Sequence, residues 1–493
     1  MVRSTFLLLL LALQLGGCAR QEPEGIRFGV QQLPFNFDPR QATDAASERV
    51  NHLLYQGLVR FDELRQPRPA LATWKRTDPR RYSFTLTGND RFDDGSPVTI
   101  RDVVATYQSI LDPAGNSPHR STLSLIREMR AVNEKTIEFL LERADPYFPS
   151  YLSAGILPAR LIEASHDFSS KPVGSGPFRL LAREAGRVQL ERKSDGLLLS
   201  LMLVKEPSVR VLKLLRSEID LLQNDLPPSL VDYLARQPGV RVRTVDGSNY
   251  TYIGFNLDDP VTGDPRIRAA VAHAIDRDAI IRHVFMGRAR KAAGLFPPEH
   301  LLGIDARDML PFDPAKSRAL LREAGYGPEH PLDLTWKTSS DPFRLRLATV
   351  MQQQLANVGI RVRIKSYDFG TFFGDIKSGN FQLYSLTWVG LKTPDTFRYI
   401  FHSESIPPGG ANRGRYRSRK ADRLIESAEN EADIDAQTIL YHQLQEQLLH
   451  DLPYVPLWYE DQLAAYRPDT LHDYVPTRDG SYDALIGLKQ HKE

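Results

Sequence analysis

This chain has almost no cysteine, very little net charge and few long apolar runs. Cys18 is the single cysteine among 493 residues, which excludes a disulfide framework. After residue 18 no apolar stretch approaches the roughly 20 residues that a membrane-spanning helix needs. The 63 basic and 61 acidic residues give a formal net charge of +2. This charge is too small to indicate a nucleic-acid-binding protein.

The remaining composition is that of a large folded body. Hydrophobic residues make up 41% of the chain and charged residues 25%, values that argue against wholesale disorder. A chain of this length is too long for one hydrophobic core, so we expect two or three domains.

The first 18 residues predict export and lipidation. Arg3 supplies a positive charge, and residues 6–13 form an apolar core too short to cross a bilayer. The sequence Leu-Gly-Gly-Cys that ends at Cys18 resembles a bacterial lipobox, whose cysteine is acylated, for example with palmitate, and begins the mature chain. We therefore expect a lipoprotein signal peptide at 1–18, a polar tether at 19–25 and a location in the cell envelope, as a periplasmic lipoprotein held at a membrane. The alternative is an ordinary signal peptide with a chance cysteine.

Strand and helix patterns alternate irregularly beyond the tether, which indicates a mixed α/β protein. Thr99 and Asp102 form the capping box of a helix that the pattern carries to residue 111. Asp264 followed by a proline predicts another helix start. Alternation of apolar and polar residues predicts strands at 26–30, 82–86, 240–242, 250–256 and 360–364, and apolar spacing predicts helical stretches at 267–281 and 424–448.

Enzymatic and metal-binding motifs are absent from the sequence. Ser175 lacks the Gly-x-Ser-x-Gly spacing of a hydrolase elbow, and no His-Glu-x-x-His occurs. The acids Asp93 and Asp94 lie beside a turn glycine without the alternating ligands of a calcium loop. Gly174 and Gly176 are interpreted as turn residues with positive φ. We expect no catalytic residues, no metal site and no cofactor.

A series of short motifs follows in a recognisable order along almost the whole mature chain. They lie at 36–40, 54–62, 71–74, 91–95, 172–178, 264–268, 274–278, 313–316 and 451–458. Their types and order resemble the family 5 extracellular solute-binding proteins, the oligopeptide-, dipeptide- and nickel-binding receptors of ABC importers.

The resemblance implies an α/β fold of the two-lobed periplasmic-binding-protein type (class II, cluster C) with an extra subdomain in the first lobe. Lobe I would comprise 26–250 with 466–493, and would include the inserted subdomain at about 52–160. Lobe II would comprise 251–465. Two chain crossovers would join the lobes and act as the hinge, at 247–250 and at 460–462.

The same resemblance implies where a ligand would bind. Peptide receptors of the family carry a motif of the form Trp-x-x-Asp-Tyr-x-Asp-Pro, whose first acid holds the peptide ammonium group. Here the tryptophan is Trp388, as a stacking wall or equally a core residue, and the acid position holds Leu391, followed by Lys392. Asp395 could substitute for the missing acid, or the ligand could lack an amine or carry an anionic group toward Lys392.

Four further residues complete the candidate ligand contacts. Tyr252 and Asn256 lie where the family lines its cleft. Arg413 and Arg415 could pair with a carboxylate through their planar forks, and exposed surface arginines are the alternative interpretation.

The sequence thus predicts a lipid-anchored receptor of an ABC importer that captures a peptide-like or other small organic solute between its lobes. The expected partners are that solute, an ABC permease with its ATPase subunits, and the membrane through the N-terminal lipid. We expect a monomer that binds no nucleic acid and is not an enzyme. The alternative is an envelope lipoprotein of the same shape that acts as a ligand sensor or chaperone without transport.

Overall fold

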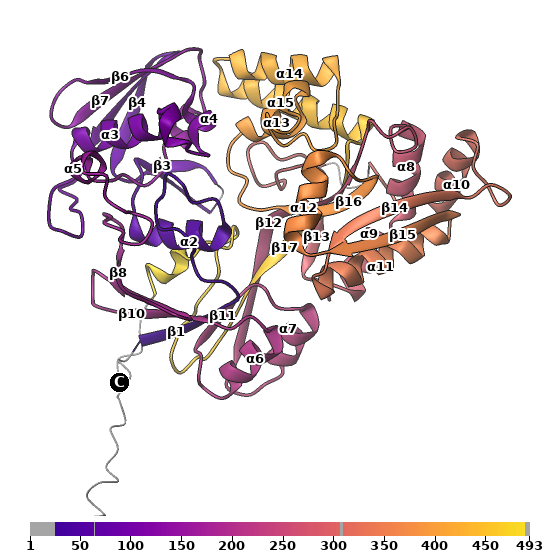
Figure 1. Cartoon of the computed structure of the whole chain (residues 1–493), viewed down its shortest axis with the longest axis horizontal. Helices are drawn as coiled ribbons and strands as arrows, with labels where there is room; N and C mark the ends of the chain where they lie inside the picture. Colours follow the sequence, from indigo (N-terminus) through magenta and orange to yellow (C-terminus); the bar gives the residue numbers. More distant parts are fainter. Residues whose placement is uncertain (1–24, 64, 306–308, 489–493) are drawn as a thin grey trace, which may run out of the picture.

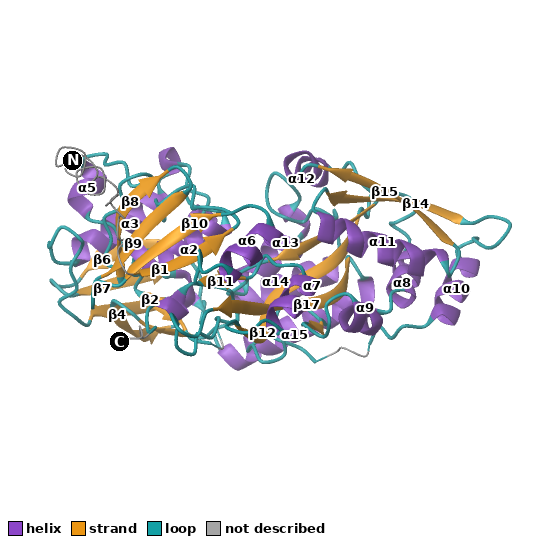
Figure 2. Ribbon diagram, turned by 90° about the horizontal axis from the view of Figure 1, so that it is seen from below, coloured by secondary structure: helices purple, strands orange, loops and turns teal. Residues whose placement is uncertain are grey.

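Two long strands join the two lobes of the molecule. In the computed structural model, which describes residues 25–63, 65–305 and 309–488, β12 (Arg241–Phe255) and β17 (Tyr454–Tyr466) pair antiparallel between the lobes (Figure 1). Figure 2 shows the same strand pair from below, between the lobes. The sequence predicted two short strands at 240–242 and 250–256, and the structure merges them into the single strand β12.

A mixed sheet extends outward from this strand pair into both lobes. In lobe I the sheet continues from β17 through β11 (Leu221–Gln223), β1 (Gly25–Val30), β10 (Leu198–Leu203), β9 (Arg187–Arg192) and β8 (Phe178–Glu184). In lobe II it continues from β12 through β16 (Leu383–Trp388), β14 (Leu332–Ser339) and β15 (Ile360–Tyr367), and β13 (Ala289–Lys291) pairs with β17. Burial of alternate residues fits strands with one covered face, as in β9.

Helices accompany the sheet in each lobe (Figure 1). Lobe I carries α2 (Ala45–Leu54), α6 (Pro207–Leu215) and α7 (Pro228–Ala235). Lobe II carries α8 (Pro265–Ala274), α9 (Arg277–His283), α10 (Pro314–Glu323), α11 (Pro342–Ala356), α12 (Phe369–Ser378), α13 (Asp395–Phe401), α14 (Arg419–Asn430) and α15 (Ile434–Asp451).

The inserted subdomain has a sheet of its own. The antiparallel order is β4 (Ala72–Asp78), β5 (Arg81–Leu86), β7 (Thr136–Leu141) and β6 (Ile126–Ala131), with the hairpin β2 (Val59–Phe61) and β3 (Pro67–Pro69) beside it. Short helices α4 (Arg120–Leu123) and α5 (Ala159–Glu163) flank the longer α3 (Ile100–Leu111). Asp102 accepts a hydrogen bond of 2.8 Å from the main-chain N–H of Thr99, so the capping box is present as predicted.

Acidic caps break two stretches that the sequence presented as continuous helices. The pattern at 267–281 divides into α8 and α9 because Asp276 accepts a hydrogen bond from Ala279 N and starts a new helix. The stretch at 424–448 divides into α14 and α15, where Asp433 accepts from the N–H groups of Asp435 and Ala436. Asp264 caps α8 with proline at its first position, as predicted.

The prediction that Gly174 and Gly176 are needed for a positive φ was wrong. Neither residue has a positive φ. A Cβ atom at Gly174 would lie 1.9 Å from the carbonyl oxygen of Leu54, and one at Gly176 would lie 2.4 Å from that of Leu53. The glycines let this loop pass directly against the end of α2, which side chains would prevent.

The predicted signal peptide, Cys18 and nearly all of the predicted tether lie outside the described residues; Gly25, the last tether residue, already belongs to β1. Among the residues that the structure describes, no helix combines the length and apolarity needed to cross a membrane.

Candidate ligand-binding cleft

The two crossover segments lie opposite each other in the central strand pair. Regular pairing of β12 with β17 is interrupted between Val245, opposite Gln462, and Asn249, opposite Glu460. Beside this irregularity Glu460 receives hydrogen bonds from Arg344 (Nη1 to Oε1, 2.5 Å) and Thr251 (3.0 Å). The Glu460 carboxylate therefore fixes β12, β17 and α11 to one another at the predicted hinge.

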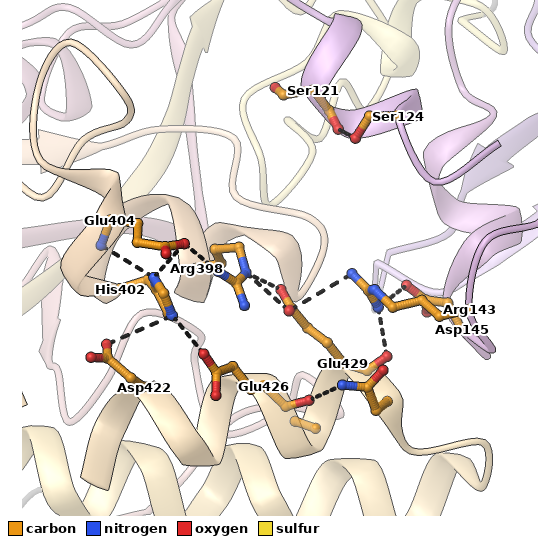
Figure 3. Close-up of polar contacts among 12 residues, drawn as sticks. Ser121, Ser124, Arg143, Asp145, Arg398, His402, Glu404, Asp422, Glu426 and Glu429 are labelled. Carbon is orange, nitrogen blue, oxygen red and sulfur yellow. Dashed lines mark hydrogen bonds and ion pairs between the residues drawn. The ribbon is translucent and has the colours of Figure 1, made fainter. Parts of the chain in front are cut away.

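The inserted subdomain touches lobe II away from the hinge (Figure 3). Arg143, just after β7, donates from Nη1 to the main-chain oxygen of Glu429 at 2.5 Å, and its Nη2 lies 3.8 Å from the Glu429 carboxylate. On the other side Arg398 holds that carboxylate with Nε at 2.8 Å. Arg76 adds a hydrogen bond of 2.8 Å to the carbonyl of Ala432. We call the Arg76, Arg143 and Glu429 contacts the subdomain latch.

Apolar side chains support the subdomain latch. One hydrophobic cluster contains Tyr147 and Phe148 of the subdomain together with Phe397 and Tyr441 of lobe II. The rings of Phe397 and Tyr441 stack with centroids 5.0 Å apart. The lobes of this structure are thus in contact on both sides of the region where the sequence predicts ligand binding.

Trp388 and Arg413 form a stacked unit beside that region. The Arg413 guanidinium carbon lies 4.6 Å from the Trp388 ring centroid and 4.9 Å from that of Phe373. Arg413 is 9% exposed, so it is not the exposed surface arginine of the alternative interpretation. Trp388 is half-buried, and its Nε1 has no hydrogen-bond partner among the described residues. The Trp388 indole N–H is thus a hydrogen-bond donor that no described residue uses.

Tyr252 belongs to the core behind that unit. It is fully buried and stacks on Tyr454 with centroids 3.8 Å apart, while the Tyr384 ring meets it edge-on at 5.8 Å. Since no Tyr252 surface is exposed, the residue supports the aromatic wall and is not a direct ligand contact in this conformation.

The side chains of two other predicted ligand contacts, Asn256 and Arg415, form hydrogen bonds with main-chain carbonyl groups. The Asn256 amide donates to the carbonyl oxygens of Gly379 and Phe381, each at 3.1 Å. Arg415 donates to the carbonyl oxygen of Arg413 at 2.7 Å. These bonds give Asn256 and Arg415 structural roles, and their contact with a ligand stays a prediction.

Lys392 and Asp395 lie on the loop and helix that follow Trp388. The Lys392 ammonium lies 5.5 Å from the ring centroid of Phe61, a residue of the inserted subdomain, so this lobe II loop reaches across to lobe I. Burial lowers the pKa of Lys392, and the nearby Arg65 cation lowers it further. Asp395 begins α13 and accepts a hydrogen bond from the Thr393 hydroxyl, and burial raises its pKa. Burial thus disfavours the charged form of Asp395, the form that would have to replace the missing ammonium partner.

The sequence analysis missed an ion pair in this region. Arg65 Nη1 lies 2.6 Å from Asp479 Oδ2, and the two residues are 414 positions apart in the chain. Neither residue belongs to a motif, so no local signal could have paired them.

Comparison with known proteins gives the family. The sequence model of the bacterial extracellular solute-binding proteins, family 5 Middle, matches residues 66–407. The chain belongs to this family. The family resemblance predicted from the sequence is confirmed. Family 5 proteins are periplasmic or extracellular solute-binding receptors and not enzymes, so the prediction of a non-enzyme is also confirmed.

Relatives align along most of this family 5 protein. It is 28% identical to di/tripeptide-binding protein 2 of Pseudomonas aeruginosa, over 91% of this chain and 92% of the relative. It is 25% identical to the periplasmic murein peptide-binding protein MppA of Escherichia coli, over 87% and 86%. The structure of NikZ from Campylobacter jejuni in complex with Ni(L-His) superposes with a TM-score of 0.83, at 21% identity and over 95% of this chain and 100% of NikZ. The predicted two-lobed α/β fold is confirmed.

Proposed function

We propose that this family 5 protein is the lipid-anchored receptor of an ABC importer, and that it captures a peptide-like or other small organic solute between its lobes and delivers it to a membrane permease. The observation that carries the proposal is the stacked unit of Trp388 and Arg413 beside the Lys392 loop, which reaches from lobe II to the inserted subdomain. The names of peptide-binding relatives that align along most of the chain support a peptide-like solute.

The proposed mechanism is closure of the lobes on the solute. A solute that contacts both lobes binds the closed form more tightly than the open form, and this difference in affinity shifts the population toward closure. The irregularity in the β12–β17 pairing marks where rotation between the lobes would be absorbed. The closed receptor would then dock on the permease.

Two measurements test the receptor proposal. Native mass spectrometry of protein purified from its own host should reveal a retained small solute. Adding that solute to emptied protein should reduce the radius of gyration in X-ray scattering, and at a hundredfold excess over Kd should add about 2.7 kcal/mol of stability. Tight binding without compaction would contradict the closure mechanism.

The lipid anchor has a separate test at Cys18. Labelled palmitate should be incorporated into the wild-type protein and not into Cys18→Ala, whose precursor should remain uncleaved by lipoprotein signal peptidase. Equal labelling of both proteins would overturn the lipobox interpretation and leave the receptor proposal intact.

A further inference from the structure

Arg65 is a buried cation with unused hydrogen-bond donors. It lies in the turn between β2 and β3, is 9% exposed and has a φ of 64°. Only Nη1 is engaged by a side chain, that of Asp479; Nε and Nη2 are buried and have no hydrogen-bond partner among the described residues. Leaving buried donors without a partner is unfavourable, and strained backbone persists where the surroundings enforce it. The Arg65 side chain is therefore positioned for an additional acceptor.

A second cation approaches from lobe II. Lys392 Nζ lies 5.5 Å from the Phe61 ring centroid, and the Arg65 guanidinium carbon lies 5.8 Å from the same centroid. Among the described residues, no carboxylate oxygen lies within 4 Å of Lys392 Nζ. Two like charges thus share one aromatic ring, one from each side of the lobe interface.

The titratable neighbours of this pair include two histidines and three acids. The Lys392 charge, followed by burial, lowers the pKa of His52 to about 3; burial, followed by the Arg65 charge, lowers that of His300 to about 4. Both imidazoles are therefore neutral at pH 7, as expected in a positive local field.

Of the acids, Asp479 is engaged by Arg65 Nη1 and Glu48 is exposed on α2. Burial, together with the Asp479 charge, raises the pKa of Asp483 to about 6. No acid among the described residues pairs directly with Lys392.

A small cavity with room for about one water molecule adjoins Arg65 next to the predicted hinge. Its lining includes His300, whose Nε2 is buried and has no hydrogen-bond partner among the described residues. Ser248 of the first crossover and Arg478 also line it, as do three acids, Glu63, Asp246 and Glu299.

We propose that Arg65 and Lys392 form a subsite for an acidic group of the solute, a carboxylate or a phosphate. The guanidinium fork would present Nε and Nη2 to two oxygens, and the Lys392 ammonium would add a point charge from the opposite lobe. The inference deepens the proposed function, on which it rests, by naming the solute as an acid. Because the cations come from different lobes, the acidic group would also favour closure.

The test compares matched probes by calorimetry on the purified protein. The acidic probe is N-acetyl-Ala-Glu, and the neutral probe is its diamide. Wild-type protein should bind the acid at least about 30-fold more tightly, the lower end expected for loss of one partner of a buried charge pair. Arg65→Gln and Lys392→Gln should each remove most of this preference, while Arg60→Gln, an exposed arginine of the same hairpin, should retain it. Circular dichroism confirms that the variants are folded.

Every outcome decides the inference. Equal affinity for acid and amide, or no binding of either at millimolar concentration, overturns the acidic subsite. If the preference for the acidic probe survives both substitutions, other residues bind the acidic group, and the proposed subsite is overturned as well. Melting curves with inorganic phosphate or acetate at matched ionic strength distinguish the two chemistries, since only the preferred anion should raise the wild-type Tm. The receptor proposal is judged separately by the retained solute and by compaction.

Discussion

At the scale of the residue, the family motif predicts that Leu391 occupies the position at which peptide receptors carry the ammonium-binding acid. It is half-buried and packs against the hydrophobic cluster that the subdomain shares with lobe II. The α-amino group of a free peptide is mostly protonated at pH 7. Enclosing it beside leucine removes its water and supplies no opposite charge.

We therefore expect the wild-type protein to prefer N-acetylated peptides and Leu391→Asp to improve binding of free-amine peptides selectively. The expected change is about 2–5 kcal/mol, which is roughly thirty- to several-thousand-fold in Kd, measured by calorimetry with free and acetylated forms of one peptide. Leu391→Asn is the matched control, because it adds polarity of similar size without charge. If wild-type protein already prefers free peptides, another acid holds the ammonium group.

Asp145 is a buried carboxyl group that makes the free energy of unfolding depend on pH. It is 3% exposed, accepts hydrogen bonds from Tyr147 N and the Tyr151 hydroxyl, and has its pKa raised to about 6 chiefly by burial. Between about pH 4 and 6 the folded state therefore binds more protons than the unfolded state, so this carboxyl makes stability fall as the pH rises through that window.

Asp145→Asn should reduce the loss of stability between pH 4.5 and 7 by up to about 2 kcal/mol. Urea denaturation at the two pH values measures the difference, and Glu134→Gln, at an exposed position of the same subdomain, is the control. An unchanged pH slope in Asp145→Asn would show that this carboxyl is not the titrating group.

At the scale of the element, Gly174 sets how closely a loop can pass the end of α2. A Cβ atom there would overlap the Leu54 carbonyl oxygen, and neither backbone can yield without displacing α2 or the loop. We expect Gly174→Ala to lower the free energy of unfolding by about 2–3 kcal/mol, near the upper end for overpacking, in urea denaturation. Gly487→Ala, where a Cβ atom would meet nothing within 4 Å, should change little; equal effects of both would contradict the packing argument.

The elements that could be predicted from the sequence are those with local causes. The helix starts at Thr99 and Asp264 carry their own capping residues, and the structure has them there. Joining two predicted strands into β12 required the partner strand β17, some 200 residues away, to pair with both parts. The pairing of Arg65 with Asp479 depends on the complete fold in the same way, as does the core position of Tyr252. Contacts between distant segments have no local pattern to reveal them.

At the scale of the whole molecule, the subdomain latch adds a contact between lobe I and lobe II that does not involve the solute. Arg143→Gln removes the cation that bridges to Glu429. We expect the variant without solute to show a larger radius of gyration than wild type in X-ray scattering, and its affinity for the solute to fall by up to about tenfold, as for loss of a charged hydrogen bond.

The control for the subdomain latch is Arg130→Gln. Arg130 lies on the same subdomain, and its side chain is 62% exposed and paired with Glu138. The same radius of gyration and solute affinity in Arg143→Gln as in wild type would mean that the subdomain latch does not bias closure.

The long antiparallel pairing of β12 with β17 limits how the lobes of this receptor can move. Both connections between the lobes are hydrogen-bonded to each other on either side of the irregularity at Val245 and Asn249. Pulling the lobes straight apart would break this ladder, whereas twisting or bending the pair at its irregularity preserves most of the bonds. We therefore expect the lobes to move relative to each other mainly by twisting or bending at this irregularity. A permease that rotates the lobes would break fewer of these hydrogen bonds than one that pulls them apart.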